Sequence, residues 1–230
     1  MSCASSTPPP LLREIHSHRR HIGYICHMDD PDFDRALVAA FFDLAGSIGW
    51  RRVTIVAAAR AGGLDLSRAR ARFPGRCAVL LRFGSLADQA ALAGIGDAPP
   101  RDLLFDIVMR RIDVLQTHRA GVAALLKALP FDPPAALLLA ATSLRSMGWL
   151  LDGAGIDTFG AVGRLRAKGM LAVWAWTVRA WQQDTSEDLS ATMAALDQAL
   201  DRAEQAEATF ARPKRSLPPE PSAAPPQEGA

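Results

Sequence analysis

The sequence predicts an all-α fold of about nine helices in a chain of 230 residues. Apolar residues recur at spacings of three and four along most of the chain, which is the period of a helix with one buried face. An alternation of period two, which would indicate a half-buried strand, persists nowhere. Glycine and proline punctuate the apolar stretches, where they end one helix and precede the next. We therefore expect helix after helix, joined by short connections.

Composition places the chain among folded globular proteins. Hydrophobic residues make up 49% of the chain and charged residues 22%, with a net charge of +2. The length accommodates a small module of about 50 residues and one larger domain. No uncharged apolar run reaches the roughly 18 to 20 residues that span a bilayer. Cys3, Cys26 and Cys77 lack a CxxC spacing, so we expect reduced cysteines and a cytoplasmic protein.

Both ends of the chain differ in composition from the middle. Residues 1–27 are expected to form a disordered leader, and Met28 is a candidate for the true translation start. Residues 211–230 are rich in Pro, Glu, Ala and Ser, as in a disordered tail. Five potential zinc ligands lie in the leader at spacings that match no structural zinc site: His16, His18, His21, Cys26 and His27.

Residues 28–74 are predicted to form a helix-turn-helix domain. The first helix is expected from Asp32 and the second over 54–61. Gly62 and Gly63 then break the chain, and Asp65 is placed to cap a short third helix over 66–72.

The short third helix carries the residues expected to touch DNA. Leu66, Ala69 and Phe73 share one face and are expected to pack inward, which turns Arg68 and Arg72 outward. A recognition helix presents its outward residues to base edges, and Arg pairs with guanine in the major groove. The predicted DNA-binding residues are Thr54, Ser67, Arg68, Arg70, Arg72 and Arg76.

Local charge supports a nucleic-acid partner. Around this motif eight arginines accompany a single acid, Asp65, although the whole chain is nearly neutral. The alternative is a solvated surface helix whose arginines reflect the base composition of a GC-rich genome. The arginines are Arg51, Arg52, Arg60, Arg68, Arg70, Arg72, Arg76 and Arg82.

Residues 75–210 are predicted to form a larger helical ligand-binding and dimerisation domain. Its first helix is expected from Gly75 and is broken at Asp97-Ala-Pro-Pro. Further helices are expected over 102–117, 118–129, 132–151, 158–183 and 186–210.

Residues 54–83 resemble the DNA-binding motif of the TetR family of transcriptional regulators. Thr54, Ala59, Gly63, Phe73 and the basic Arg76 fall in matching places. The departures are Gly62 for Ala, Leu64 for Val, Asp65 for a capping Ser, and Arg70 for a tyrosine that contacts a DNA phosphate. The resemblance implies a TetR-like fold, an operator-binding homodimer, and an effector cavity in the larger domain.

The resemblance also implies roles for two sets of residues in the larger domain, although plain core packing is the alternative for both. The expected effector-cavity residues are Phe131, Met147, Trp149, Leu150, Met170 and Trp174. The last two helices of such regulators pair across a two-fold axis, where we expect Trp176, Trp181, Leu189, Met193, Leu196 and Leu200.

Residues 144–202 are also similar to lipid-binding accessory proteins of ubiquinone biosynthesis, which share the TetR-like fold without reading DNA. The similarity lies in the order of a Trp-bearing helix, an Asp-Thr hinge, a helix ending W-x-x-D-x-S and a last helix. A separate amphipathic helix after Phe210, which that family carries, is not evident here.

Catalytic motifs are absent from the sequence. There is no nucleophile with an adjacent base, no paired-carboxylate site, no phosphate loop and no HExxH. We therefore expect no enzyme, no cofactor and no metal. The favoured function is a TetR-like regulator that binds a palindromic operator as a dimer and responds to a small hydrophobic effector. The alternative is the lipid-binding accessory protein.

Overall fold

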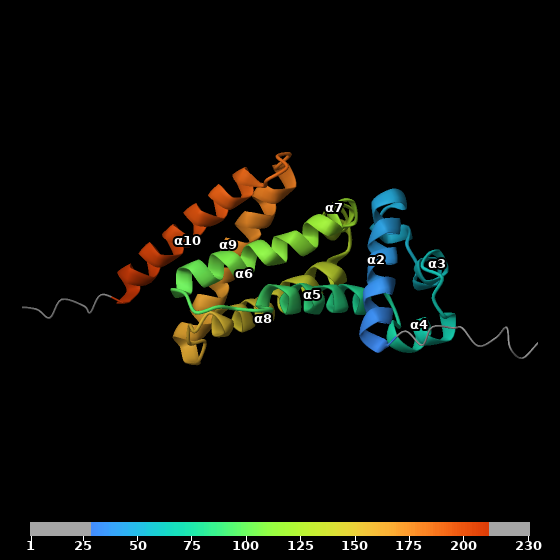
Figure 1. Cartoon of the computed structure of the whole chain (residues 1–230), viewed down its shortest axis with the longest axis horizontal. Coiled ribbons are helices and arrows are strands. Elements are labelled where there is room, and N and C mark those ends of the chain that lie inside the picture. The colour runs from blue at the N-terminus through green and yellow to red at the C-terminus, as the bar shows by residue number, and fades with distance from the viewer. Residues whose placement is uncertain (1–28, 212–230) are drawn as a thin grey trace, which may run out of the picture. The chain divides into compact units, whose positions relative to one another are not determined.

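The computed structural model describes residues 29–211, which form nine α-helices and two short 3-10 turns without a strand (Figure 1). The all-α prediction is confirmed for this part of the chain. The predicted leader and start at Met28, and nearly all of the predicted tail, lie outside the described residues. The helices are α2 (Asp30–Ile48), α3 (Ile55–Ala61), α4 (Leu66–Arg72), α5 (Arg76–Leu92), α6 (Pro100–Thr117), α7 (Arg119–Ala128), α8 (Pro133–Gly153), α9 (Gly160–Gln183) and α10 (Ser190–Ala211), with turns η1 (Trp50–Arg52) and η2 (Leu129–Phe131).

The described residues fall into two compact units. Unit 1 contains residues 29–89 and 114–142, and unit 2 contains residues 90–113 and 143–211. Helices α5, α6 and α8 contribute residues to both units. The predicted boundary at residue 74, between the helix-turn-helix domain and the larger domain, does not coincide with the boundaries of these units, and it stays a prediction.

Helix α2 organises the core of unit 1. It begins two residues before the predicted start, because Asp29 caps it by accepting a hydrogen bond from the Asp32 backbone N–H at 2.7 Å. The Phe41 and Trp50 rings meet edge to face at a centroid distance of 5.2 Å. Helix α7 crosses α2 closely, since a Cβ atom added at Gly121 would lie 2.2 Å from the carbonyl oxygen of Phe42.

In unit 2, α9 packs against α10, and the junction between them is held by Asp184. The side chain of Asp184 is only 5% exposed. Its Oδ1 accepts hydrogen bonds from the backbone N–H and the hydroxyl of Ser186, at 3.0 and 2.5 Å. Its Oδ2 accepts the corresponding pair from Thr192, at 2.8 and 2.7 Å. These bonds shape a loop, so α10 begins at Ser190 and not at the predicted residue 186.

Helix α8 is the one helix of the described residues that is long and apolar enough to cross a membrane by length and composition. Its most apolar window has a mean hydropathy of 1.2, and a third of that window is buried in the protein. Arg145 and Asp152 lie within the helix, which is why the sequence showed no uncharged run of this length. Core helices of soluble proteins pass the same test, so cytoplasmic localisation stays a prediction.

Candidate nucleic-acid interface

Helices α3 and α4 form the predicted helix-turn-helix within unit 1. Thr54 caps α3 by accepting a hydrogen bond from the Ala57 N–H at 3.1 Å. Gly63 turns the chain with a φ of 63°, a left-handed conformation that glycine adopts without strain. Asp65 then caps α4, its Oδ1 accepting the Arg68 N–H at 2.7 Å. The predicted span of α4 and its aspartate cap are confirmed.

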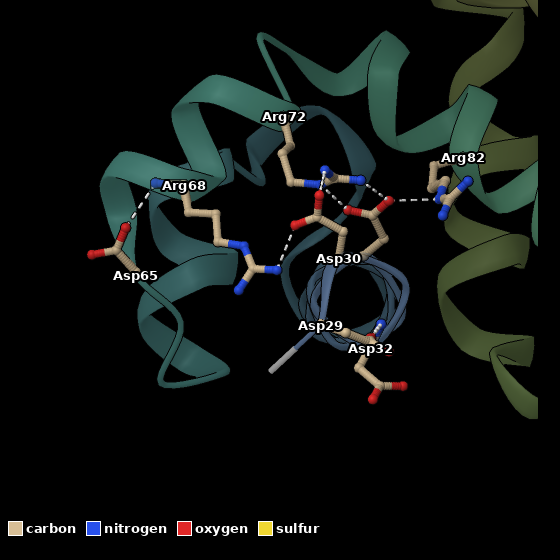
Figure 2. Close-up of polar contacts among 8 residues, drawn as sticks. Asp29, Asp30, Asp32, Asp65, Arg68, Arg72 and Arg82 are labelled. Atoms are coloured by element: carbon tan, nitrogen blue, oxygen red, sulfur yellow. Dashed lines mark hydrogen bonds and ion pairs between the residues drawn. The ribbon is translucent and has the colours of Figure 1, made fainter. Parts of the chain in front are cut away.

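The predicted outward orientation of Arg68 and Arg72 is wrong. Both side chains turn from α4 toward α2 (Figure 2). Arg68 Nη2 donates to Asp30 Oδ1 at 2.6 Å, and the guanidinium lies 4.4 Å from the centre of the Phe33 ring. Arg72 Nε and Nη2 donate to the two oxygens of Asp34 at 2.5 and 2.7 Å. This is the paired geometry in which guanidinium and carboxylate bind most strongly.

The remaining contacts join these groups into one ion-pair network. Arg72 Nη1 lies 2.7 Å from Asp30 Oδ2, and Arg82 Nε of α5 lies 2.8 Å from Asp34 Oδ2. The Arg82 N–H is not directed at the carboxylate, so this last contact is an ion pair without a hydrogen bond. The hydrogen bond from Arg68 lowers the pKa of Asp30, and that to Asp34 raises the pKa of Arg72.

The error in orientation has a geometric cause. Consecutive residues are about 100° apart around a helix, so Arg68 and Arg72 lie beside the buried Ala69 and Phe73 and not opposite them. The partners Asp30 and Asp34 on α2 lie 38 residues earlier in the sequence, outside the arginine-rich stretch from residue 51 to residue 82. The available signal was Asp30 and Asp34, four residues apart and so on one face of the first helix.

The outer face of α4 is less basic than predicted. Ser67, Arg70 and Ala71 are exposed on it, and Leu66 is 42% exposed although it was expected to pack inward. The Ser67 hydroxyl donates to Asp65 Oδ1 at 2.6 Å, and Arg70 Nη1 donates to the Pro74 carbonyl at 3.1 Å.

A groove of about 200 Å³ lies between α3 and α4 on this outer side. Leu66 and Arg70 of α4 line it together with Ile55 and Val56 of α3. Buried Ala69 and Phe73 complete its apolar lining, with Pro74 at its end. The groove is therefore apolar except for the guanidinium of Arg70.

Several other arginines near the motif keep their charge available. Arg51, Arg52, Arg60 and Arg70 are exposed, and within residues 29–211 no ion pair to an acid is found for any of them. Arg76 is half-buried and donates from Nη1 to the Arg51 carbonyl at 3.2 Å, a contact that leaves its charge uncompensated. Arg51 and Arg52 belong to the eight arginines around the motif, but they are not among the predicted DNA-binding residues.

The predicted effector residues separate into buried and exposed groups. Phe131 belongs to unit 1, and the other five belong to unit 2. In unit 2 the guanidinium of Arg111 stacks 4.7 Å from the centre of the Trp174 ring. Buried residues are Met147, Leu150, Met170 and Trp174, whereas Phe131 and Trp149 are exposed.

Four of the six predicted dimer residues are buried within the described part of the chain. Trp181, Leu189, Leu196 and Leu200 are buried between α9, α10 and the rest of unit 2. Met193 is half-buried. Trp176 is 49% exposed and has the Arg202 guanidinium 5.7 Å from its ring centre. Trp176, and in part Met193, are therefore the members of this set that remain accessible at the surface.

Comparison with solved structures identifies the fold. A TetR transcriptional regulator from Nitrosomonas europaea ATCC 19718 superposes with a TM-score of 0.62 at 18% identity, over 75% of this chain and 98% of that chain. The flavonoid-responsive regulator FrrA gives a TM-score of 0.40 at 17% identity, over 76% of this chain and 96% of that one. No family model and no curated protein matches the sequence. The chain therefore has the fold of the TetR transcriptional regulators.

Proposed function

We propose that this protein is a transcriptional regulator that binds operator DNA as a homodimer through α3 and α4. The observation that carries the proposal is the set of exposed arginines around a capped helix-turn-helix: Arg51, Arg52, Arg60 and Arg70. Phosphate contacts from such side chains supply much of the affinity for DNA and fix the register of the protein on the duplex.

The roles of the predicted DNA-binding residues are revised accordingly. Arg70, Arg76, Ser67 and the α3 cap Thr54 remain candidates for contact with DNA. Arg68 and Arg72 instead hold α4 against α2, so they fix the angle at which the outer face of α4 would meet the major groove of DNA. They are positioning residues in this proposal.

The experiment is a selection of duplexes from a random-sequence library by the purified protein, followed by binding measurements at several salt concentrations. We expect enrichment of one palindromic sequence and a binding constant that falls steeply with salt. The slope of log K against log salt should decrease by about 0.9 for each phosphate contact removed. The double variant Arg52→Ala plus Arg70→Ala should therefore show a shallower slope than the wild type.

Arg145→Ala is the matched control, because Arg145 is an exposed arginine in unit 2. It should leave both affinity and salt slope unchanged. Equal losses in the control and the double variant would mean that binding is non-specific attraction to basic protein, which contradicts the proposal.

The homodimer in this proposal uses the exposed face of α9. Val162, Leu165 and Trp176 are exposed on one side of the helix, with the small residues Gly169 and Ala172 exposed between them. Small residues allow two helices to approach closely, and a stripe of this width is typical of helix pairing. Leu165→Asp should convert the dimer into a monomer in sedimentation equilibrium, and an unchanged mass would contradict this surface.

A ligand-controlled release is the remaining part of the proposal. The buried Met and Trp side chains of unit 2 supply an apolar environment for a small hydrophobic effector. Such an effector can release DNA only if it binds the DNA-incompetent conformation more tightly than the competent one.

Lipid binding without DNA is a second candidate function, favoured by one observation. Asp30 and Asp34 neutralise two of the arginines that were expected to read bases. Mass spectrometry of lipids that co-purify with the protein distinguishes the candidates. Bound isoprenoid lipid together with no enriched duplex would support the lipid-binding accessory protein and contradict the regulator.

A further inference from the structure

We infer that the helix-turn-helix reads thymine methyl groups through Leu66, and this inference rests on the proposed DNA-binding function. Leu66 is the first residue of α4 and is 42% exposed. The N-terminal residues of a recognition helix are those that reach base edges in the major groove. A leucine in that position has no hydrogen bond to offer, and the apolar feature of the major groove is the 5-methyl group of thymine.

The exposed residues of α4 are Leu66, Ser67, Arg70 and Ala71, so apolar side chains make up half of the surface that can reach base edges. Bidentate recognition of guanine requires an arginine directed at the bases, but Arg68 and Arg72 are directed at Asp30 and Asp34. The exposed alanine at position 71 is also apolar.

The groove between α3 and α4 gives a methyl group somewhere to lie. Leu66 and the 48% exposed Val56 form its two sides, and Phe73 is part of its lining. Arg70 places a cation beside this apolar surface, which suits a thymine attached to an anionic backbone. An apolar patch next to a guanidinium matches duplex DNA better than it matches an uncharged apolar partner.

The test replaces every thymine of the most enriched duplex by deoxyuridine, which keeps base pairing and removes only the 5-methyl group. We expect the wild-type protein to bind the uracil duplex more weakly. The affinity should fall by about fourfold for each methyl contact that is lost, and by about 15-fold when one contact is lost in each of the two half-sites. Leu66→Ala should bind the two duplexes with affinities equal within about twofold, because the side chain that contacts the methyl group is gone.

Leu81→Ala is the matched control. Leu81 is 45% exposed on α5 in the same unit, and it does not line the groove. This variant should keep the wild-type preference for thymine.

Three outcomes would overturn the inference. Equal binding of both duplexes by the wild type would mean that methyl groups are not read, while the proposed function would stand. A preference for thymine that survives Leu66→Ala would mean that other residues read them. Failure to enrich any duplex would remove the proposed function itself, and the inference with it.

Discussion

Asp34 of unit 1 and Asp184 of unit 2 are both nearly inaccessible, at 3% and 5% exposure, yet they are stabilised in different ways. Asp34 faces two arginines, Arg72 and Arg82. Asp184 accepts four hydrogen bonds from uncharged donors of Ser186 and Thr192. A buried carboxylate is tolerated only when its charge is paired or its oxygens are hydrogen-bonded. Within residues 29–211, Asp34 relies on charged partners and Asp184 on uncharged hydrogen-bond donors.

The difference determines what each aspartate controls. The partners of Asp34 lie on α4 and α5, 38 and 48 positions away in sequence, so it ties distant helices together. Ser186 and Thr192 lie within eight residues of Asp184, so these hydrogen bonds shape one local junction. Removing the first should disturb the tertiary packing of the helix-turn-helix, and removing the second should disturb the start of α10.

The largest effect is expected for Asp34→Ala. The variant removes the carboxylate that pairs with Arg72 and Arg82, although Arg72 keeps its ion pair with Asp30. Hydrogen bonds to charged groups contribute about 1.5–3 kcal/mol each, and the remaining pair offsets part of the loss, so we expect the free energy of unfolding to fall by about 2–3 kcal/mol. Urea denaturation followed by circular dichroism measures it. Asp32→Ala is the control on the same helix, because its pair with Arg35 is exposed and should contribute no more than about 0.5 kcal/mol. Similar losses in both variants would show that the α2–α4 network is not a specific tie.

A smaller effect is expected for Asp184→Asn. The amide keeps one acceptor oxygen, and the hydroxyls of Ser186 and Thr192 can rotate to donate elsewhere, but the amide NH₂ faces donors. We expect the melting temperature to fall by several degrees in differential scanning calorimetry. Glu187→Gln, an exposed change in the same loop, should leave it unchanged. An unaltered melting temperature in Asp184→Asn would mean that the junction is held by packing alone.

Acidification should separate the two units by the pH at which each loses stability. Burial beside Phe42 and Phe83 lowers the pKa of His118 in unit 1, although Asp43 opposes the shift. The folded state therefore binds fewer protons than the unfolded state, and the contribution of His118 is complete above about pH 6.5 and decreases below it.

For Asp184, the hydrogen bond from the Ser186 hydroxyl is the largest cause of a lowered pKa, followed by that from the Thr192 hydroxyl. Its contribution is complete above about pH 4 and is lost only at lower pH. Urea midpoints measured between about pH 7 and pH 5 should fall in the wild type and fall less in His118→Phe. If the urea midpoint changed equally with pH in the wild type and in His118→Phe, His118 would not be the source of the loss of stability.

Local features of this chain were predictable, and partners distant in sequence were not. The Gly62-Gly63 break and the Asp65 cap fixed α4 at its observed bounds, since both depend on residues within one turn. The inward rotation of Arg68 and Arg72 depends on Asp30 and Asp34, which no local pattern connects to them. Leu66 was assigned to the wrong side for a related reason, because a seven-residue helix has too few residues to define its buried face.

The crossing of α2 and α7 at Gly121 has a consequence for how far a small change can act. A methyl group there would overlap the Phe42 carbonyl, so α2 would have to move to make room. Helix α2 carries the carboxylates that hold α4, and any displacement of α2 is transmitted to the residues that we propose to contact DNA. Position 121, which carries no functional group, is thus a site where one added carbon atom would shift α4 without contacting it.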